Sequence, residues 1–199
     1  LALQRMKNLV KLISILKNDK NLEVILVSSG AVGAGYTELK LDKTVLANKQ
    51  TLAAIGQPKL MKTYQEMFQE FGITVAQMLF IADDFDSRKR SKNAKNVMEI
   101  LLQNNVIPII NENDVIATEE LIGDNDQLAA YITHYFKADM LVILTDIDGY
   151  YDKNPREFSD AKIQKIINEI SQDELDKKPS ANSKFATGGI VTKLKAADF

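Results

Sequence analysis

The sequence contains no cysteine and one histidine, and both scarcities exclude kinds of chemistry. Without cysteine the chain has no disulfide framework, no thiolate metal site and no cysteine nucleophile. The one histidine, His134, stands among Ile132, Tyr135 and Phe136 in a helical stretch, so we expect a structural role for it. Catalysis by a serine–histidine–acid triad therefore has little support.

The sequence also lacks a long apolar run and a strong net charge. No apolar stretch approaches the roughly 20 residues that cross a bilayer, so we expect a cytoplasmic protein with no membrane partner. A formal net charge of -2 gives no general attraction for nucleic acid. The basic cluster RKRSK, Arg88 to Lys92, is a local exception, and a solvated or subunit-facing surface is the alternative explanation. The partner is expected to be a small molecule.

What is present is an ordinary globular composition. The 199 residues are 45% hydrophobic and 26% charged, which fits one domain with a substantial core. Both ends read as interior helix, since TKLKAADF closes the chain in a helical pattern and one face of the first helix carries Met6, Leu9, Val10, Ile13 and Leu16. We expect a single domain over residues 1–199, truncated at both ends relative to a longer protein.

Apolar runs alternate with helical stretches along the chain. The expected strands are Glu23 to Val27, Ile73 to Phe80, Val106 to Ile110 and, with the strongest pattern, Met140 to Thr145. The expected helices include two between Thr44 and Glu70, broken at Gly56 to Pro58, then Ser91 to Gln103 and Asp124 to Phe136. This alternation predicts an α/β fold, a three-layer α/β/α sandwich around a mostly parallel central sheet.

Three polar motifs directly follow predicted strands. SSGAVGAG (28–35) follows EVILV, NEND (111–114) follows VIPII, and TDIDG (145–149) follows LVIL. Open α/β sheets bind ligands outside the carboxyl ends of their strands. The sequence therefore predicts a ligand site where the three motifs meet.

The glycine-rich motif has two readings. As a functional loop, its backbone N–H groups and the Ser29 hydroxyl cradle carboxylate or phosphate oxygens. As a purely structural feature, it is a tight turn between a strand and a helix. It fits neither the dinucleotide-binding fingerprint nor the P-loop, so the motif alone does not decide between them.

Short polar side chains are dense in NEND and in GDND (123–126). Seven of them fall within 16 positions: Asn111, Glu112, Asn113, Asp114, Asp124, Asn125 and Asp126. Such a group suits an ammonium ion or a metal–phosphate complex. Asp124 alone would be explained as a helix cap, but a cap needs only one such residue, which favours the functional reading.

The stretch TGGIVTK (187–193) places a glycine pair before a helix and a lysine in its first turn. That arrangement would aim N–H groups and an ammonium charge at an anion, and a flexible hinge is the alternative. The lysine is the informative part, because a transferred phosphoryl group needs positive charge nearby.

With these motifs assembled, the chain resembles the amino acid kinase family over essentially its whole length. The resemblance rests on SSGAVGAG, NKQTLAAIGQ, INENDVIAT, GDNDQLAA, LTDIDGYYDKNP and ATGGIVTKLKAAD. The first, third and fourth of these resemble members that act on glutamate rather than on acetylglutamate, aspartate, uridylate or carbamate. The activity that the resemblance implies is ATP-dependent phosphorylation of the γ-carboxylate of L-glutamate, the first step towards proline.

The resemblance also implies roles for individual residues. Glutamate would be held by Ser29, Gly30, Ala31, Asp114 and Asn125. ATP would be held by Thr145, Asp146, Thr187, Gly188, Gly189, Ile190, Val191, Thr192 and Lys193. Lys193 would also stabilise the phosphoryl group in flight, and Asp126 would orient the catalytic lysines. A further catalytic lysine of the family lies in a lysine-x-glycine motif, which has no counterpart among these residues.

The implied cofactors are ATP and Mg²⁺, with the metal bound mostly through phosphates and water and with no protein ligand predicted. The family further implies a homo-oligomer, a dimer or tetramer, and feedback inhibition by proline. A non-catalytic sensor of amino acid or nucleotide and a kinase with another carboxylate acceptor remain the alternatives. Lys193 argues against the sensor, because binding alone needs no lysine facing the phosphoryl group.

Overall fold

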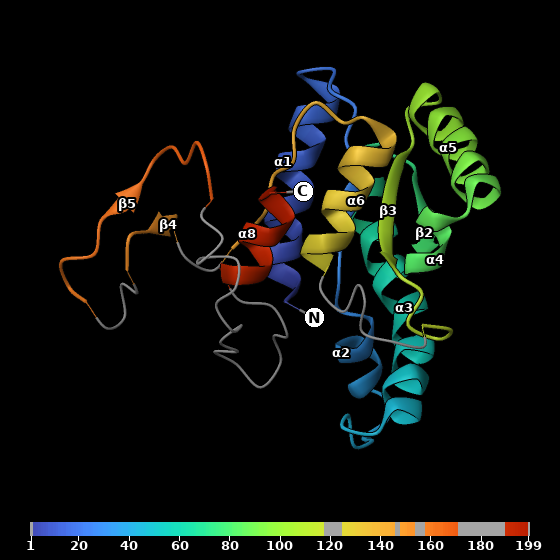
Figure 1. The fold of residues 1–199 in the computed structure, drawn as a ribbon. Coiled ribbons are helices and arrows are strands. Elements are labelled where there is room, and N and C mark those ends of the chain that lie inside the picture. Colours follow the sequence, from blue (N-terminus) through green and yellow to red (C-terminus); the bar gives the residue numbers. More distant parts are fainter. Residues whose placement is uncertain (1, 118–124, 146–147, 154–157, 171–189, 199) are drawn as a thin grey trace. The chain divides into compact units, whose positions relative to one another are not determined.

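The computed structural model describes residues 2–117, 125–145, 148–153, 158–170 and 190–198 (Figure 1). The chain groups into two compact units, Leu1–Leu128 and Ala129–Phe199. The first unit carries α1 (Leu3–Asn18), β1 (Leu26–Val27), α2 (Ala31–Tyr36), α3 (Leu46–Gln69), β2 (Val75–Phe80), α4 (Ala82–Asp86), α5 (Arg88–Gln103), β3 (Ile107–Glu112) and the start of α6 (Asn125–Phe136). The second carries the rest of α6, then β4 (Tyr150–Tyr151), β5 (Ile163–Gln164) and α8 (Ile190–Asp198).

A parallel sheet of three strands, in the order β1-β3-β2, organises the first unit. Leu26 pairs with Ile109, and Val75 to Phe80 pair with Ile107 to Glu112. Because β3 lies between β1 and β2, the crossovers through α3 and α5 run in opposite directions. Right-handed crossovers then place α3 and α5 on opposite faces of the sheet. The predicted α/β fold with a parallel sheet between helical layers is confirmed.

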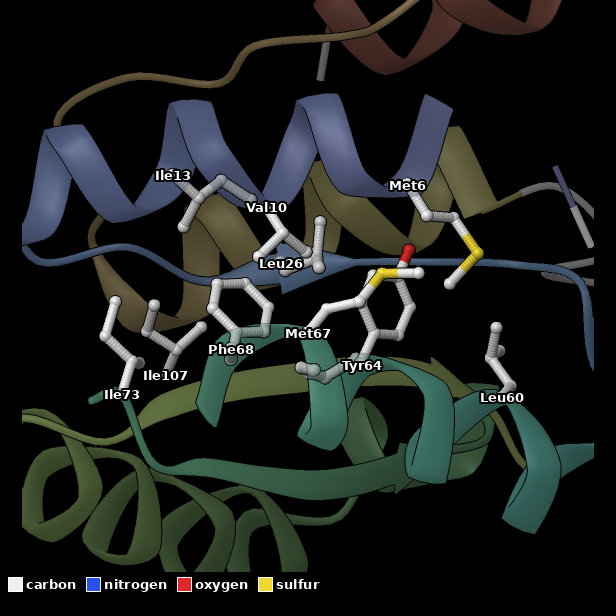
Figure 2. Close-up of a cluster of buried hydrophobic side chains, with 11 residues drawn as sticks. Met6, Val10, Ile13, Leu26, Leu60, Tyr64, Met67, Phe68, Ile73 and Ile107 are labelled. Carbon is white, nitrogen blue, oxygen red and sulfur yellow. The ribbon is translucent and has the colours of Figure 1, made fainter. Parts of the chain in front are cut away.

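The main core lies between the sheet and helices α1 and α3 (Figure 2). Its members are Met6, Val10, Ile13, Leu26, Leu60, Tyr64, Met67, Phe68, Ile73, Ile107 and Ile109. Successive residues of a strand face opposite sides, so Ile107 and Ile109 face this core while Ile110, also fully buried, faces the layer of α5. The continuous apolar run of β3 is thereby explained, since both faces of the strand are covered.

The prediction that GQP breaks a helix into two is wrong. Helix α3 runs through Pro58 without interruption from Leu46 to Gln69. Proline removes one backbone donor, but a single buried stripe from Leu52 to Phe68 continues on both sides of it. The packing of that stripe against α2 and the sheet outweighs the one lost hydrogen bond.

The strand predicted over Met140 to Thr145 is also wrong. The structure assigns no strand to residues 141–145, and no strand among the described residues pairs with them. Met140, Val142 and Leu144 are 77%, 68% and 60% exposed, while the residues between them are half-buried. Side-chain exposure therefore alternates from one residue to the next, as in an extended chain. No described strand pairs with this segment through backbone hydrogen bonds, so it is not a β-strand. The second unit pairs β4 with β5 instead, in a short antiparallel ladder that the sequence did not predict.

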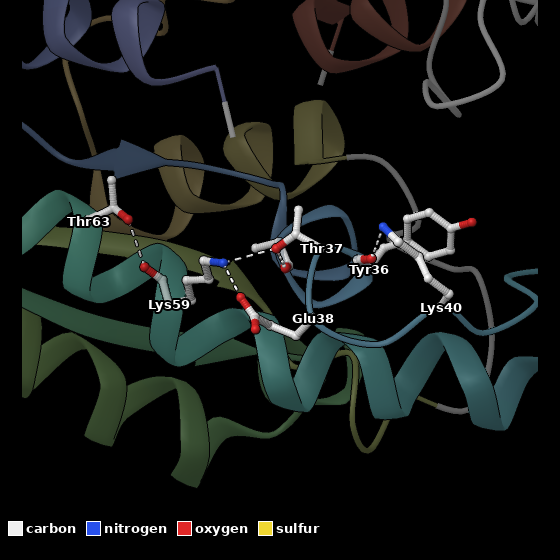
Figure 3. A network of polar contacts seen from close by, with 7 residues as sticks. Tyr36, Thr37, Glu38, Lys40, Lys59 and Thr63 are labelled. Atoms are coloured by element: carbon white, nitrogen blue, oxygen red, sulfur yellow. Dashed lines mark hydrogen bonds and ion pairs between the residues drawn. The ribbon is translucent and has the colours of Figure 1, made fainter.

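A polar network joins the end of α2 to the exposed side of α3 (Figure 3). The Lys59 ammonium pairs with the Glu38 carboxylate and donates to Thr37 Oγ1 at 2.9 Å. The hydrogen bond from Lys59, followed by the Lys59 charge, lowers the pKa of Glu38 below its ordinary value. The paired side chains are solvent-exposed, so the network contributes little to the stability of the fold.

Candidate active site

The carboxyl ends of β1 and β3 bring two of the three predicted motifs to one edge of the sheet. The two strands are hydrogen-bonded neighbours and run parallel, so both end at this edge. The Ser28 N–H donates to Ile110 O at 2.9 Å, and the Asn113 N–H donates to Phe80 O at 2.8 Å. The glycine loop therefore starts at the end of β1, whereas NEND comprises the last two residues of β3 and the two residues that follow it.

Structural needs account for two of the three glycines in the loop. Gly30 has a φ of 117°, a left-handed conformation that favours glycine, and it precedes α2. A side chain on Gly35 would overlap the backbone of Leu52 in α3, so this glycine lets the two helices touch. Gly33 has nothing within 4 Å of the place where a Cβ would stand. The tight-turn reading thus fits Gly30, Gly35 has a role in helix packing, and Gly33 is the one glycine of the motif without a packing role.

The Ser28–Ser29 pair is held from the helical layer below it. The Ser28 and Tyr64 hydroxyl oxygens lie 2.8 Å apart and share a hydrogen bond. Tyr64 is 3% exposed, and burial raises its pKa, so the phenol is neutral and acts as a fixed tie. Ser29 is exposed at the edge, whereas Ala31 is buried, so Ala31 can offer a ligand only backbone atoms.

NEND supplies two half-buried carboxylates at the end of β3. Burial raises the pKa of Asp114 above its ordinary value of 3.8, and Lys49 partly opposes this rise. Burial is also the main cause that raises the pKa of Glu112, followed by the charge of Asp114, again with Lys49 in opposition. Two carboxylates with one ammonium group acting on both leave net negative potential, which suits a positively charged ligand group.

A chain of four carboxamides crosses this edge of the sheet. Asn125 Nδ2 donates to Asn111 Oδ1 at 3.1 Å, and Asn111 Nδ2 donates to Gln57 Oε1 at 2.9 Å. Gln57 Nε2 then donates to Gln77 Oε1 at 2.9 Å. Asn111 is 4% exposed, and these bonds satisfy its buried amide. The chain links α6, β3, α3 and β2, and it places Asn125 beside NEND.

Asp126 stands in the first turn of α6, half-buried and next to Asn125. Asp124, the expected cap, lies outside the described residues. All six residues predicted for glutamate binding and for orienting the lysines belong to the first unit: Ser29, Gly30, Ala31, Asp114, Asn125 and Asp126.

The residues predicted to hold ATP belong to the second unit. Thr145 is exposed at the end of the unpaired segment 141–145, and Lys193 is half-buried in the first turn of α8. Ile190, Val191 and Thr192 open α8, which confirms the predicted helix. Asp146, Thr187, Gly188 and Gly189 lie outside the described residues. The residues predicted to bind ATP and those predicted to bind glutamate therefore belong to different units.

Other predicted features of the sequence have structural roles. Arg90 in RKRSK contacts the Asp84 carboxylate at 3.3 Å and donates to Asp83 O at 2.7 Å, so it fastens α4 to α5. His134 is exposed on α6 and makes an edge contact with the Tyr135 ring. Over the part of the chain that the structure describes, no three or more His, Cys, Asp or Glu residues gather to hold a metal ion.

Sequence reasoning did not single out Lys49, Gln57, Tyr64 or Gln77 as site residues. All but Gln77 lie on α3, and Lys49 and Gln57 fall within NKQTLAAIGQ, the motif quoted above only for its resemblance. No helix among the described residues is long and apolar enough to cross a membrane.

A solved structure shares the fold. The crystal structure of a T. acidophilum isopentenyl phosphate kinase product complex matches 80% of this chain and 68% of its own, with a TM-score of 0.52 and 16% identity. At that identity the likeness supports the fold alone.

Curated relatives are far closer in sequence. Proteins named glutamate 5-kinase are 57% identical in Wolinella succinogenes (100% of this chain, 78% of that protein), 53% in Leishmania donovani (100% and 75%) and 53% in Helicobacter hepaticus (98% and 74%). The model of the amino acid kinase family matches residues 2–198, which span both units. The resemblance predicted from the motifs is confirmed, and the chain belongs to the amino acid kinase family.

Proposed function

We propose that this protein transfers the γ-phosphoryl group of ATP to the γ-carboxylate of L-glutamate, giving L-glutamyl 5-phosphate and ADP, the first step of proline biosynthesis. The relatives' shared name supports glutamate as the acceptor. The observation that supports the proposal is the sheet edge at which β1 and β3 end, because Ser29 follows β1, Asp114 follows β3, and Asn125 donates a hydrogen bond to Asn111 of β3. Glutamate brings an ammonium group for the carboxylates and two carboxylates for hydroxyl and backbone donors.

Different residues are proposed to bind the ammonium group and the carboxylates of glutamate. Asp114, with Glu112 beside it, faces the ammonium group, and Asn125 offers amide atoms next to it. The Ser29 hydroxyl and the backbone at Gly30 and Ala31 receive a carboxylate. Negative potential from the half-buried acids favours the cationic end of the substrate and fixes its direction.

The chemistry requires no general base. The γ-carboxylate of glutamate has a pKa near ~4.3, so it is ionised at neutral pH. One of its oxygens forms a bond to the γ-phosphorus while the bond from that phosphorus to the β,γ-bridging oxygen breaks, and the electron pair leaves with ADP. No proton moves in this step, so positioning and charge neutralisation carry the catalysis.

The second unit would supply the positive charge that neutralises the transferred phosphoryl group. Lys193 is proposed to stabilise the transferred phosphoryl group, and Asp126 of the first unit to orient the catalytic lysines. Thr145, Asp146 and residues 187–192 are proposed to hold ATP. Mg²⁺ would bind phosphate oxygens and water, and it would add positive charge at the phosphates.

We further propose a cytoplasmic homo-oligomer that proline inhibits. Membership of the amino acid kinase family supports this proposal. Sedimentation of the purified protein and glutamate titrations with and without proline test the two parts separately.

The function is tested by ADP release from magnesium-ATP with glutamate, acetylglutamate, aspartate and uridylate offered in parallel. Hydroxylamine traps the acyl phosphate as a hydroxamate. Turnover with glutamate alone is the expected result. Turnover with another acceptor would reassign Asp114 and Asn125, and folded protein that binds ATP but turns over none of the four would be a sensor.

A further inference from the structure

The four carboxamides at the sheet edge form a chain with a direction. In each bond the amide nitrogen of one residue donates to the amide oxygen of the next, from Asn125 through Asn111 and Gln57 to Gln77. The nitrogen and oxygen of a carboxamide lie on opposite sides of the group, so each bond sets the orientation of the amide before it. We call these four residues the amide relay.

The relay determines what Asn125 presents to a ligand. Its nitrogen is engaged by Asn111, so its oxygen, Oδ1, lies on the other side of the carboxamide. If every amide in the chain were reversed, Asn125 would present nitrogen donors there instead. An oxygen suits an ammonium group and a nitrogen suits a carboxylate.

We propose that Gln57 is a positioning residue that, through Asn111, holds Asn125 with its oxygen towards the ligand and so selects acceptors that carry an α-ammonium group. The inference rests on the proposed function and goes beyond it by naming how one end of the substrate is recognised. Gln57 need not touch the substrate itself.

The position of Gln57 explains the GQP motif, which is not a helix break. Gly56 lets α3 approach α2, since a side chain there would overlap the backbone of Ala31 and Gly35. Pro58 leaves the helix continuous. Between them Gln57 is half-buried and reaches both β3 and β2, so a tightly packed stretch of helix supports the relay.

Two substitutions of Gln57 distinguish an effect on the orientation of the relay amides from an effect on side-chain packing. Gln57→Glu keeps an oxygen that accepts from Asn111, and the exposed Gln77 can turn to donate to it. Gln57→Leu has a similar size but accepts nothing, which leaves the buried Asn111 amide free to rotate and Asn125 without a fixed orientation.

The experiment compares glutamate with glutarate, which has both carboxylates but no ammonium group. For each variant we would measure kcat/KM for both acceptors, the KM for ATP and the unfolding temperature. Gln57→Leu is expected to lower the glutamate-to-glutarate preference about 5- to 20-fold, the effect of losing one well-placed hydrogen bond to a charged group. Gln57→Glu is expected to keep the preference within about twofold, and neither variant should change the KM for ATP.

An unchanged preference in Gln57→Leu, or equal losses in both variants, would overturn the relay. If Gln57→Leu fails to fold, Gln77→Leu at the exposed end of the relay gives the same comparison with a smaller expected loss. The proposed function fails separately, when the unaltered protein turns over neither acceptor. In that case, calorimetric titration with glutamate and with glutarate still measures whether the amide relay favours binding of the ligand that carries an ammonium group.

Discussion

At the scale of single residues, Asp114 carries its charge where that charge is unfavourable for folding. Burial raises its pKa, and a carboxylate whose folded-state pKa is raised adds stability below its unfolded pKa and loses that contribution as pH rises through the folded-state pKa. Near pH 7 the ionised group therefore lowers the free energy of unfolding. The same charge raises the pKa of Glu112, which adds to the effect.

Asp114→Asn is accordingly expected to raise the unfolding temperature near pH 7 and to lose this gain as pH falls towards the ordinary range of a carboxyl group, near 3.8. Its KM for glutamate should rise at least about tenfold, because a charged hydrogen-bond partner of the ammonium group is lost. Thermal unfolding between pH 4 and 8, with steady-state kinetics at pH 7, measures both. Asp86→Asn, at an exposed aspartate, is the control, and a pH-independent change in Asp114→Asn would contradict the assignment.

Sequence reasoning reaches some of these residues and not others for a physical reason. Ser29 and Asp114 stand out in the sequence because both belong to short polar motifs beside apolar strands, where open α/β sheets bind ligands. Gln57 and Tyr64 were not, since a glutamine or tyrosine on a long helix reads as surface or core. Their roles become visible only in the folded structure, where α3 packs beside the strands and the polar atoms of Gln57 and Tyr64 reach Asn111 and Ser28.

At the scale of elements, the close approach of α2 and α3 depends on Gly35 and Gly56, where a side chain would overlap the backbone of the other helix. Gly56→Ala would place a methyl group into the Ala31 carbonyl and the Gly35 nitrogen, both backbone atoms that yield only if the helices separate. We expect the free energy of unfolding to fall by about 2–3 kcal/mol. Denaturant unfolding measures it.

Gly33→Ala is the matched control on α2, because its Cβ would meet nothing within 4 Å. Replacing glycine by alanine in a helix stabilises by up to about 1 kcal/mol, so this variant should be unchanged or slightly more stable. Equal destabilisation by Gly56→Ala and Gly33→Ala would contradict the packing explanation.

The same contact shows why the predicted helix break failed. Proline and glycine signal a break when only the local chain is considered. In α3 the buried stripe that begins at Leu52 and ends at Phe68 spans the motif, so tertiary packing decides against the local signal. Met140 to Thr145 shows the opposite case, in which an apolar pattern is present but no neighbouring strand pairs with it.

At the scale of the whole molecule, the two substrates are assigned to different units. Every residue proposed to hold glutamate belongs to residues 1–128, whereas Lys193 belongs to the second unit. Glutamate binding and phosphoryl transfer should therefore respond to different substitutions. The sequence pointed to both sets of residues but contained no signal for this division.

Lys193→Met is expected to lower kcat about 10²- to 10³-fold, as for the loss of one group that stabilises charge in a transition state, and to leave the dissociation constant of glutamate unchanged. Single-turnover kinetics with calorimetric glutamate binding in the absence of ATP separate the two effects. Lys195→Met, an exposed lysine on the same helix, should alter neither. Loss of glutamate binding in Lys193→Met would mean that the lysine supports the first unit's site, and an undiminished kcat would place the phosphoryl-stabilising charge on another residue.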